Sequence, residues 1–170
     1  NTVPNATNRV ELESKIALAS EKAVTHHGFF IGATSDNVAD LQSIEGMDGV
    51  CGIKIFMGSS TGDLLVHEQA HLENIFANTG GIIATHAEDE NRLQTRIPQF
   101  EHRTDIAAHA ECRDIECALL ATKRASALAK DHDHRLHIVH LTSGSEADWL
   151  ASNKGDLITT EVCTQHLTFD

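Results

Sequence analysis

Three segments of the chain place a basic side chain inside or at the end of an apolar run. Lys54 lies in the middle of residues 50–57, and His86 and His140 end the runs that begin at Ile82 and Leu136. A charged ammonium group is rarely left in a core unless it is paired or chemically altered. These residues therefore indicate one polar site built from three strands.

The chemistry of such a site follows from the residue types. A lysine ammonium has no lone pair and cannot bind a metal, but the side chain becomes a ligand when it reacts with carbon dioxide to form a carbamate. The two carbamate oxygens can bridge two cations about 3.5–4 Å apart. Neutral imidazoles are common zinc ligands. One interpretation of Lys54, His86 and His140 is thus a zinc centre.

The elements that hold these residues alternate along the chain. Strands are predicted over residues 29–34, 52–57, 82–88, 136–141 and 157–163, and helices over 9–24, 38–44, 67–78, 113–130 and 146–152. Near-continuous apolar strands alternating with helices are typical of a parallel α/β sheet covered on both faces. A doubly wound sheet and a (β/α)8 barrel both fit, and polar groups at several strand ends favour the TIM barrel.

A complete barrel has eight strands in roughly 250 residues. The 170 residues are therefore expected to form the central portion of one barrel domain, residues 1–170, with about five strands and without the first strands and the last. The polar segment 89–110 is expected to be a long loop over the active site. We expect the isolated 170 residues to be inactive and prone to associate through unpaired strand edges.

Strand alternation predicts which side chains point into the barrel. The inward set is Gly52, Lys54, Phe56, Ala84, His86, Glu88, Ile138, His140, Thr159, Glu161 and Cys163. A second interpretation remains open: Lys54 extends to the barrel mouth to bind phosphate or carboxylate, and the histidines are core residues. The pattern alone supports both interpretations equally.

Composition limits the classes of partner. Thirteen basic and twenty-five acidic residues give a net charge of −12 without a basic patch, which argues against nucleic acid and anionic membranes and favours a small-molecule substrate. The four cysteines contain no CxxC pair, so we expect reduced thiols in a cytoplasmic protein. His26, His27, His132 and His134 are expected on the solvated surface.

Several motifs together resemble dihydroorotase, a cyclic amidase of the amidohydrolase superfamily. They are Asn1-Thr-Val-Pro4, the Gly52–Gly62 segment GIKIFMGSSTG, His86-Ala-Glu-Asp89, the segment HIVHLTS from His137, and TEVCTQHL from Thr160. The resemblance implies that Lys54 is carboxylated, that His86 and His140 bind the second of two zinc ions, and that Asn1 holds the substrate carboxylate. It also implies a His-x-His pair before Asn1 and a general-base aspartate beyond Asp170.

The implied activity is the reversible hydrolysis of dihydroorotate to N-carbamoyl-aspartate in pyrimidine biosynthesis, with a homodimer possible. Other cyclic amidases, such as hydantoinase (dihydropyrimidinase) or allantoinase, and a catalytically inactive scaffold are the alternatives. Thr164 and Gln165 stand where the family often has Pro and His. Glu161 and His166 are expected near the centre, and His109 and Arg113 are expected to cap a helix or lie on the surface.

Overall fold

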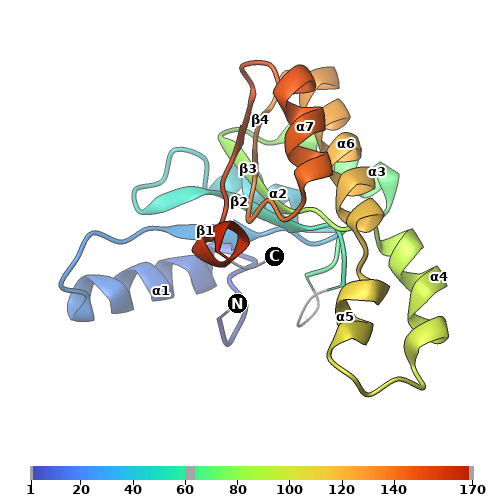
Figure 1. The fold of residues 1–170 in the computed structure, drawn as a ribbon. Coiled ribbons are helices and arrows are strands. Elements are labelled where there is room, and N and C mark those ends of the chain that lie inside the picture. The colour runs from blue at the N-terminus through green and yellow to red at the C-terminus, as the bar shows by residue number, and fades with distance from the viewer. Residues whose placement is uncertain (1, 60–63, 169–170) are drawn as a thin grey trace.

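The computed structural model describes residues 2–59 and 64–168, in which five strands form one parallel sheet. The strands are β1 (Phe29–Gly32), β2 (Val50–Phe56), β3 (Ile82–His86), β4 (Arg135–Ile138) and β5 (Ile158–Thr160). Their order in the sheet is their order in the chain (Figure 1). A doubly wound sheet reverses its strand order, whereas a barrel does not. The predicted α/β fold, a section of a barrel, is confirmed.

One helix before the first strand and four helices between the strands cover one face of this sheet (Figure 1). They are α1 (Arg9–Lys22), α2 (Val38–Ser43), α3 (Gln69–Asn78), α6 (Ile115–Asp131) and α7 (Gly144–Asn153). A short 3-10 helix, η1 (Thr164–Leu167), follows β5. Within residues 2–59 and 64–168, no helix is both long enough and apolar enough to cross a membrane.

The strand register separates an apolar row from a polar row. Ile53, Ile83, Leu136 and Ile158 are register partners, and each is at most 1% exposed beneath the helices. Burying each such side chain contributes about 1.5–3 kcal/mol, which fixes this face of the sheet. The neighbouring row on the opposite face contains Gly32, Lys54, Ala84, His137 and Thr159.

The register corrects one predicted orientation. Ile138 is only 1% exposed and belongs to the helix-covered core, whereas His137 pairs with Ala84 on the face that carries Lys54. The prediction counted alternate residues back from His140, but β4 ends at Ile138. The backbone of His140 is left-handed, with φ of 43°, so strand alternation does not extend to this residue.

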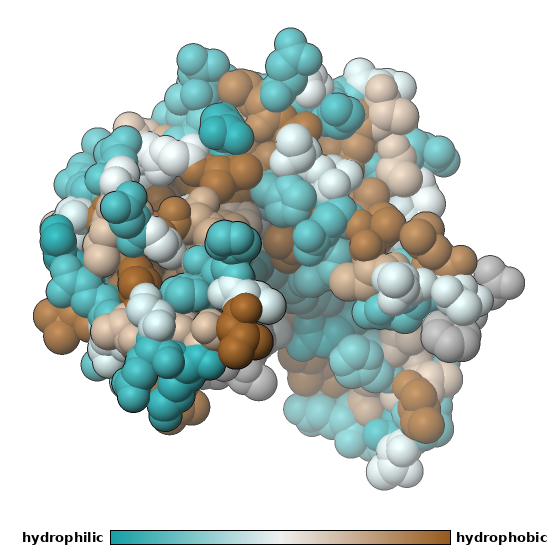
Figure 2. Space-filling model, turned by 90° about the vertical axis from the view of Figure 1, so that its left-hand side faces the viewer, coloured by the Kyte–Doolittle hydropathy of each residue, from teal (hydrophilic) through white to brown (hydrophobic). Residues whose placement is uncertain are grey.

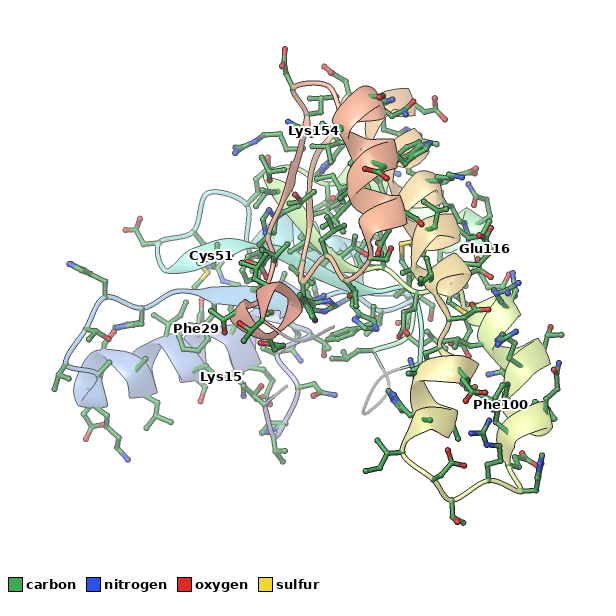
Figure 3. All side chains as sticks on the ribbon, viewed as in Figure 1. Lys15, Phe29, Cys51, Phe100, Glu116 and Lys154 are labelled. Carbon is green, nitrogen blue, oxygen red and sulfur yellow. The ribbon has the colours of Figure 1, made fainter. Side chains whose placement is uncertain are left out.

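The segment predicted as a loop over residues 89–110 is instead largely helical. It forms α4 (Glu90–Phe100) and α5 (Ala107–Cys112), which project away from the sheet, with Phe100 at the far end of α4 (Figure 3). The Asp89 carboxylate caps α4 by accepting from the backbone N–H of Arg92 at 2.8 Å. Because α4 buries only two of its residues, its sequence has few of the apolar positions that predict a helix.

His134 is buried rather than solvated. Its Nδ1 lies 3.0 Å from the carbonyl oxygen of Arg135, and its Nε2 lies 3.0 Å from that of Thr79. Its ring also packs edge-on against Phe76, with centroids 5.6 Å apart. The surface prediction was wrong here. The residues around His134 in the sequence are polar, and they give no sign of its contact with Thr79, which connects the start of β4 to the end of α3. His26 and His27 are exposed as predicted.

Candidate metal centre

The two histidines expected as metal ligands lie side by side, with ring centroids 4.9 Å apart and ring planes inclined at 62°. His86 ends β3, His140 follows β4, and the distance from His86 Nδ1 to His140 Nε2 is 3.0 Å. Two nitrogens that bind one tetrahedral zinc at about 2.0–2.1 Å stand about 3.3 Å apart. The described pair therefore has the donor types and nearly the spacing that a zinc ion requires.

Lys54 lies on the same face of the sheet, next to Phe56. Its Nζ donates to the carbonyl oxygen of Ile55 at 3.3 Å and stands 4.4 Å from the centroid of the Phe56 ring. The Phe56 ring is in turn 5.9 Å from the ring of His86. Burial lowers the pKa of Lys54 to about 7, against the opposing charge of Glu161. A large share of this amine is thus unprotonated at neutral pH, which is the form that reacts with carbon dioxide.

The same environment keeps His140 uncharged. Burial lowers the pKa of His140, and the neighbouring charges of His86 and Lys54 lower it further, although Glu161 and a backbone hydrogen bond act in the opposite direction. A neutral imidazole has the lone pair that a metal needs. The protein therefore favours the metal-binding form of this ring.

Glu88 joins the site from the end of β3. Its Oε2 lies 2.7 Å from His86 Nε2, and the same oxygen forms an ion pair with Arg113. Burial raises the pKa of Glu88, but the His86 hydrogen bond and the charge of Arg113 outweigh this and lower it below its usual value. Glu88 therefore holds the His86 ring as a carboxylate.

Arg113 is a site residue that the sequence reasoning missed. It was expected at a helix cap or on the surface, and it does end α5, but its guanidinium lies at Glu88 and donates to the carbonyl oxygen of Ser59 at 3.2 Å. Gly58 leaves room for Glu88 beside the segment after β2, because a Cβ at Gly58 would lie 2.5 Å from Glu88 Cβ. His109 is exposed, as expected.

A second polar group follows β5. Glu161 Oε2 lies 3.4 Å from His137 Nε2, while its Oε1 accepts from the backbone N–H of His140 at 3.4 Å. His137 also lies 2.8 Å from the Thr159 hydroxyl through its Nδ1. The sequence placed Glu161 near the centre, but His137 was assigned no role because it was counted on the wrong face.

His166, also expected near the centre, has no hydrogen bond to these groups. His166 lies in η1, and its buried Nδ1 has no hydrogen-bond partner within the described chain. Asn1 and residues 60–62 of the Gly58–Gly62 loop lie outside the described residues.

The surface around these groups is hollowed. A pocket of about 340 Å³ is lined by His86, Glu88, Arg113 and His140, and a separate pocket of about 310 Å³ is lined by Lys54 and Phe56. Figure 2 shows a hollow near the middle of one face, with hydrophilic residues inside it. Across the described residues, no three histidine, cysteine, aspartate or glutamate side chains converge on one metal position. The unmodified side chains thus offer two adjacent imidazole nitrogens, with Lys54 in the neighbouring pocket.

Comparison with known proteins gives this geometry a context. The chain is 33% identical to an allantoinase of Streptomyces avermitilis and 30% identical to a dihydroorotase of Methanothermobacter thermautotrophicus. The alignments cover 99% and 100% of the chain. The chain is homologous to these cyclic amidases. It spans 38% of the length of each, and no family model matches it.

Solved structures agree with the fold. An L-hydantoinase (dihydropyrimidinase) from Arthrobacter aurescens superposes with a TM-score of 0.86 at 22% identity, over 95% of this chain and 37% of that enzyme. A dihydropyrimidinase from Brevibacillus agri gives 0.78 at 28% identity, over 94% of this chain and 37% of that one. The resemblance to cyclic amidases of the amidohydrolase superfamily, expected from the motifs, is thereby confirmed.

Proposed function

We propose that residues 1–170 form the central part of a metal-dependent cyclic amidohydrolase, and that its activity is the reversible hydrolysis of dihydroorotate to N-carbamoyl-aspartate. The observation that carries the proposal is the pair of imidazole nitrogens 3.0 Å apart, on the face of the sheet that holds a desolvated lysine amine. Relatives named dihydroorotase support the choice of reaction, as do the Asn1-Thr2 opening and the GSSTG sequence of residues 58–62.

The residues present fit part of a two-zinc centre. Lys54 as a carbamate would bridge the ions, and His86 Nδ1 and His140 Nε2 would hold one of them. When bound, zinc lowers the pKa of a bound water to near 7 and polarises a carbonyl group. The other ligands and the general-base aspartate would come from outside residues 1–170.

The remaining residues position groups around that centre. Glu88 orients His86, and Glu161 holds the His140 backbone and the His137 ring. Asn1 would bind the substrate carboxylate. Because the chain carries a net charge of −12, attraction of an anionic substrate depends on cations and donors at the site rather than on the overall charge.

Allantoinase is the second candidate. The identity to the Streptomyces allantoinase, 33%, is slightly higher than the 30% to the Methanothermobacter dihydroorotase, and hydantoinases share the fold. These reactions all open a cyclic amide, so the metal centre alone does not distinguish them. The residues that contact the substrate ring decide the choice.

Turnover by the intact gene product tests the proposal. We expect two zinc ions per chain and hydrolysis of dihydroorotate in preference to allantoin, hydantoin and dihydrouracil. Preference for allantoin would establish the second candidate instead. A protein that binds no metal and hydrolyses none of the four compounds would be an inactive scaffold, and the proposal would be wrong.

Lys54→Ala in the intact gene product should remove bound zinc and activity together. The loss of turnover should exceed the 10–100-fold that typically follows removal of a group behind a metal ligand, because a bridging ligand itself is lost. Lys130→Ala, on the exposed end of α6, is the matched control and should keep both properties. Two zinc ions and normal turnover in Lys54→Ala would contradict the carbamate.

The setting of the enzyme completes the proposal. All four cysteines are free thiols, which supports a reducing compartment such as the cytoplasm. We also propose that the enzyme acts on its small-molecule substrate as a homodimer.

A further inference from the structure

Three segments distant in the sequence meet at the guanidinium of Arg113. Its Nη1 forms the ion pair with Glu88 at the end of β3, and its Nη2 donates to Ser59 O beyond β2. Arg113 itself connects α5 to α6, because it ends α5 and is followed by Asp114, the N-cap of α6. The planar guanidinium is thereby held on two sides, by the Ser59 carbonyl and by Glu88, whose side chain is only 15% exposed.

Ser59 is also held from a second direction. The carboxylate of Glu90 accepts from the Ser59 N–H at 2.6 Å and from its hydroxyl at 2.6 Å, and Glu90 is only 2% exposed. The carbonyl that receives Arg113 therefore belongs to a restrained backbone. The contact is consequently a fixed anchor for the guanidinium.

The contact with Glu88 leads directly to His86. A carboxylate accepts hydrogen bonds, so the proton of the His86 ring must lie on Nε2, which is 2.7 Å from Glu88 Oε2. In the uncharged ring Nδ1 then keeps its lone pair and lies 3.0 Å from His140 Nε2. Fixing the tautomer of a ligand histidine through its other nitrogen strengthens metal binding.

We propose that Arg113 is a positioning residue for the metal centre, which acts by holding the Glu88 carboxylate against His86 Nε2 so that Nδ1 is free to bind the metal. The proposal rests on the proposed function for the presence of a metal. The alignment of Glu88 and His86 itself is a property of the metal-free protein. Arg113 thus links the α5–α6 connection and the segment after β2 to the tautomer of one ligand ring.

Zinc affinity of the intact gene product, measured by competition with a chelator, gives the first test. Arg113→Gln should weaken zinc binding by about 10-fold, and Glu88→Gln by about 10–100-fold. The double variant should match Glu88→Gln alone, since Arg113 acts through Glu88. Arg103→Gln removes a partly exposed arginine of the preceding α4–α5 connection, paired with Asp105 and Glu111, and should leave the affinity unchanged.

Two results would overturn the proposal. One is a loss of zinc affinity in Arg113→Gln that is no greater than the loss in Arg103→Gln. The other is a double variant whose loss is the product of the two single losses, since Arg113 would then act independently of Glu88. Circular dichroism of each variant shows whether the protein is folded, and Arg113→Lys supplies a replacement that keeps the charge. A lysine makes only single-point contacts, so it should restore part of the affinity.

Nitrogen-15 NMR of the His86 ring in metal-free protein gives the second test. The native protein should show the proton on Nε2, and Arg113→Gln should show a mixture of tautomers. An unchanged His86 tautomer in folded Arg113→Gln would overturn the proposal even if zinc binding fell. A protein that binds no zinc but shows the tautomer shift would contradict the proposed function while supporting the role of Arg113.

Discussion

At the scale of single residues, burial gives Lys54 a chemical state that a surface lysine does not have. Its pKa is about 7, so near neutral pH it is divided between ammonium and free amine. The unfolded chain binds a proton at Lys54 up to a pKa of about 10.4, so protonation is linked to folding.

The metal-free protein should therefore become more stable as pH rises from about 7 to about 10. In that window the unfolded state binds a proton at Lys54 that the folded state does not, so stability rises by up to about 1.4 kcal/mol per pH unit. Urea unfolding at pH 7.5 and 9.5, in buffer free of carbon dioxide, measures the effect. Lys54→Met should lose this increment, whereas the exposed variant Lys130→Met should keep it; equal slopes in all three proteins would disprove the linkage.

The residue types and their positions in apolar runs predicted some residues of the candidate metal centre and not others. Lys54, His86 and His140 stand out because their polar groups interrupt or end apolar runs, although their role as metal ligands stays a prediction. Arg113 has no such signal, since its partners Glu88 and Ser59 lie 25 and 54 residues away. Contacts of this kind depend on how the helices fold back, and local sequence does not reveal them.

At the scale of elements, His134 joins two neighbouring units of the barrel. It lies just before β4, and the carbonyl of Thr79 that it contacts ends α3. A buried ring with both nitrogens placed at carbonyl oxygens positions one element against the other. Its contact with Phe76 adds apolar packing to the hydrogen bonds.

His134→Ala should lower the free energy of unfolding by about 2–3 kcal/mol. The variant loses the hydrogen bond of the ring N–H to a carbonyl oxygen, about 0.5–1.5 kcal/mol, and leaves a cavity beside Phe76. Chemical denaturation measures the change. His132→Ala, two residues earlier on the same turn, serves as control and should shift the free energy by less than about 0.5 kcal/mol; equal effects of the two variants would show that His134 has no special role.

The elements were predictable where burial is one-sided and periodic. All five strands were found, because each carries isoleucine or leucine on the helix-covered face. Helices α4 and α5 were missed, because they project from the barrel and bury little apolar surface. The left-handed turn at His140 was also missed, since histidine gives no signal for positive φ comparable to that of glycine.

At the scale of the whole molecule, the described sheet has two edges. β1 pairs only with β2, and β5 pairs only with β4, so both present unpaired backbone groups within the described part of the chain. The face that carries Lys54 is also partly open, with Phe30 42% exposed. Edges and apolar surface of this kind promote association between copies.

The isolated 170-residue chain should therefore be inactive and should associate in solution. Light scattering after size-exclusion chromatography measures its mass, and zinc analysis with a dihydroorotate assay measures its function. The intact gene product, treated in parallel, is the control and should elute as one defined species. A monodisperse and active 170-residue chain would contradict both expectations.

The positive φ of His140 has a practical consequence for anyone who wishes to silence this protein genetically. Most side chains at that position would strain the backbone, so a valine or isoleucine allele would combine a folding defect with the missing imidazole. Asparagine tolerates a left-handed backbone and lacks the ring. Under the proposed function, H140N is thus the cleaner knock-out, and its phenotype would report on chemistry rather than on protein abundance.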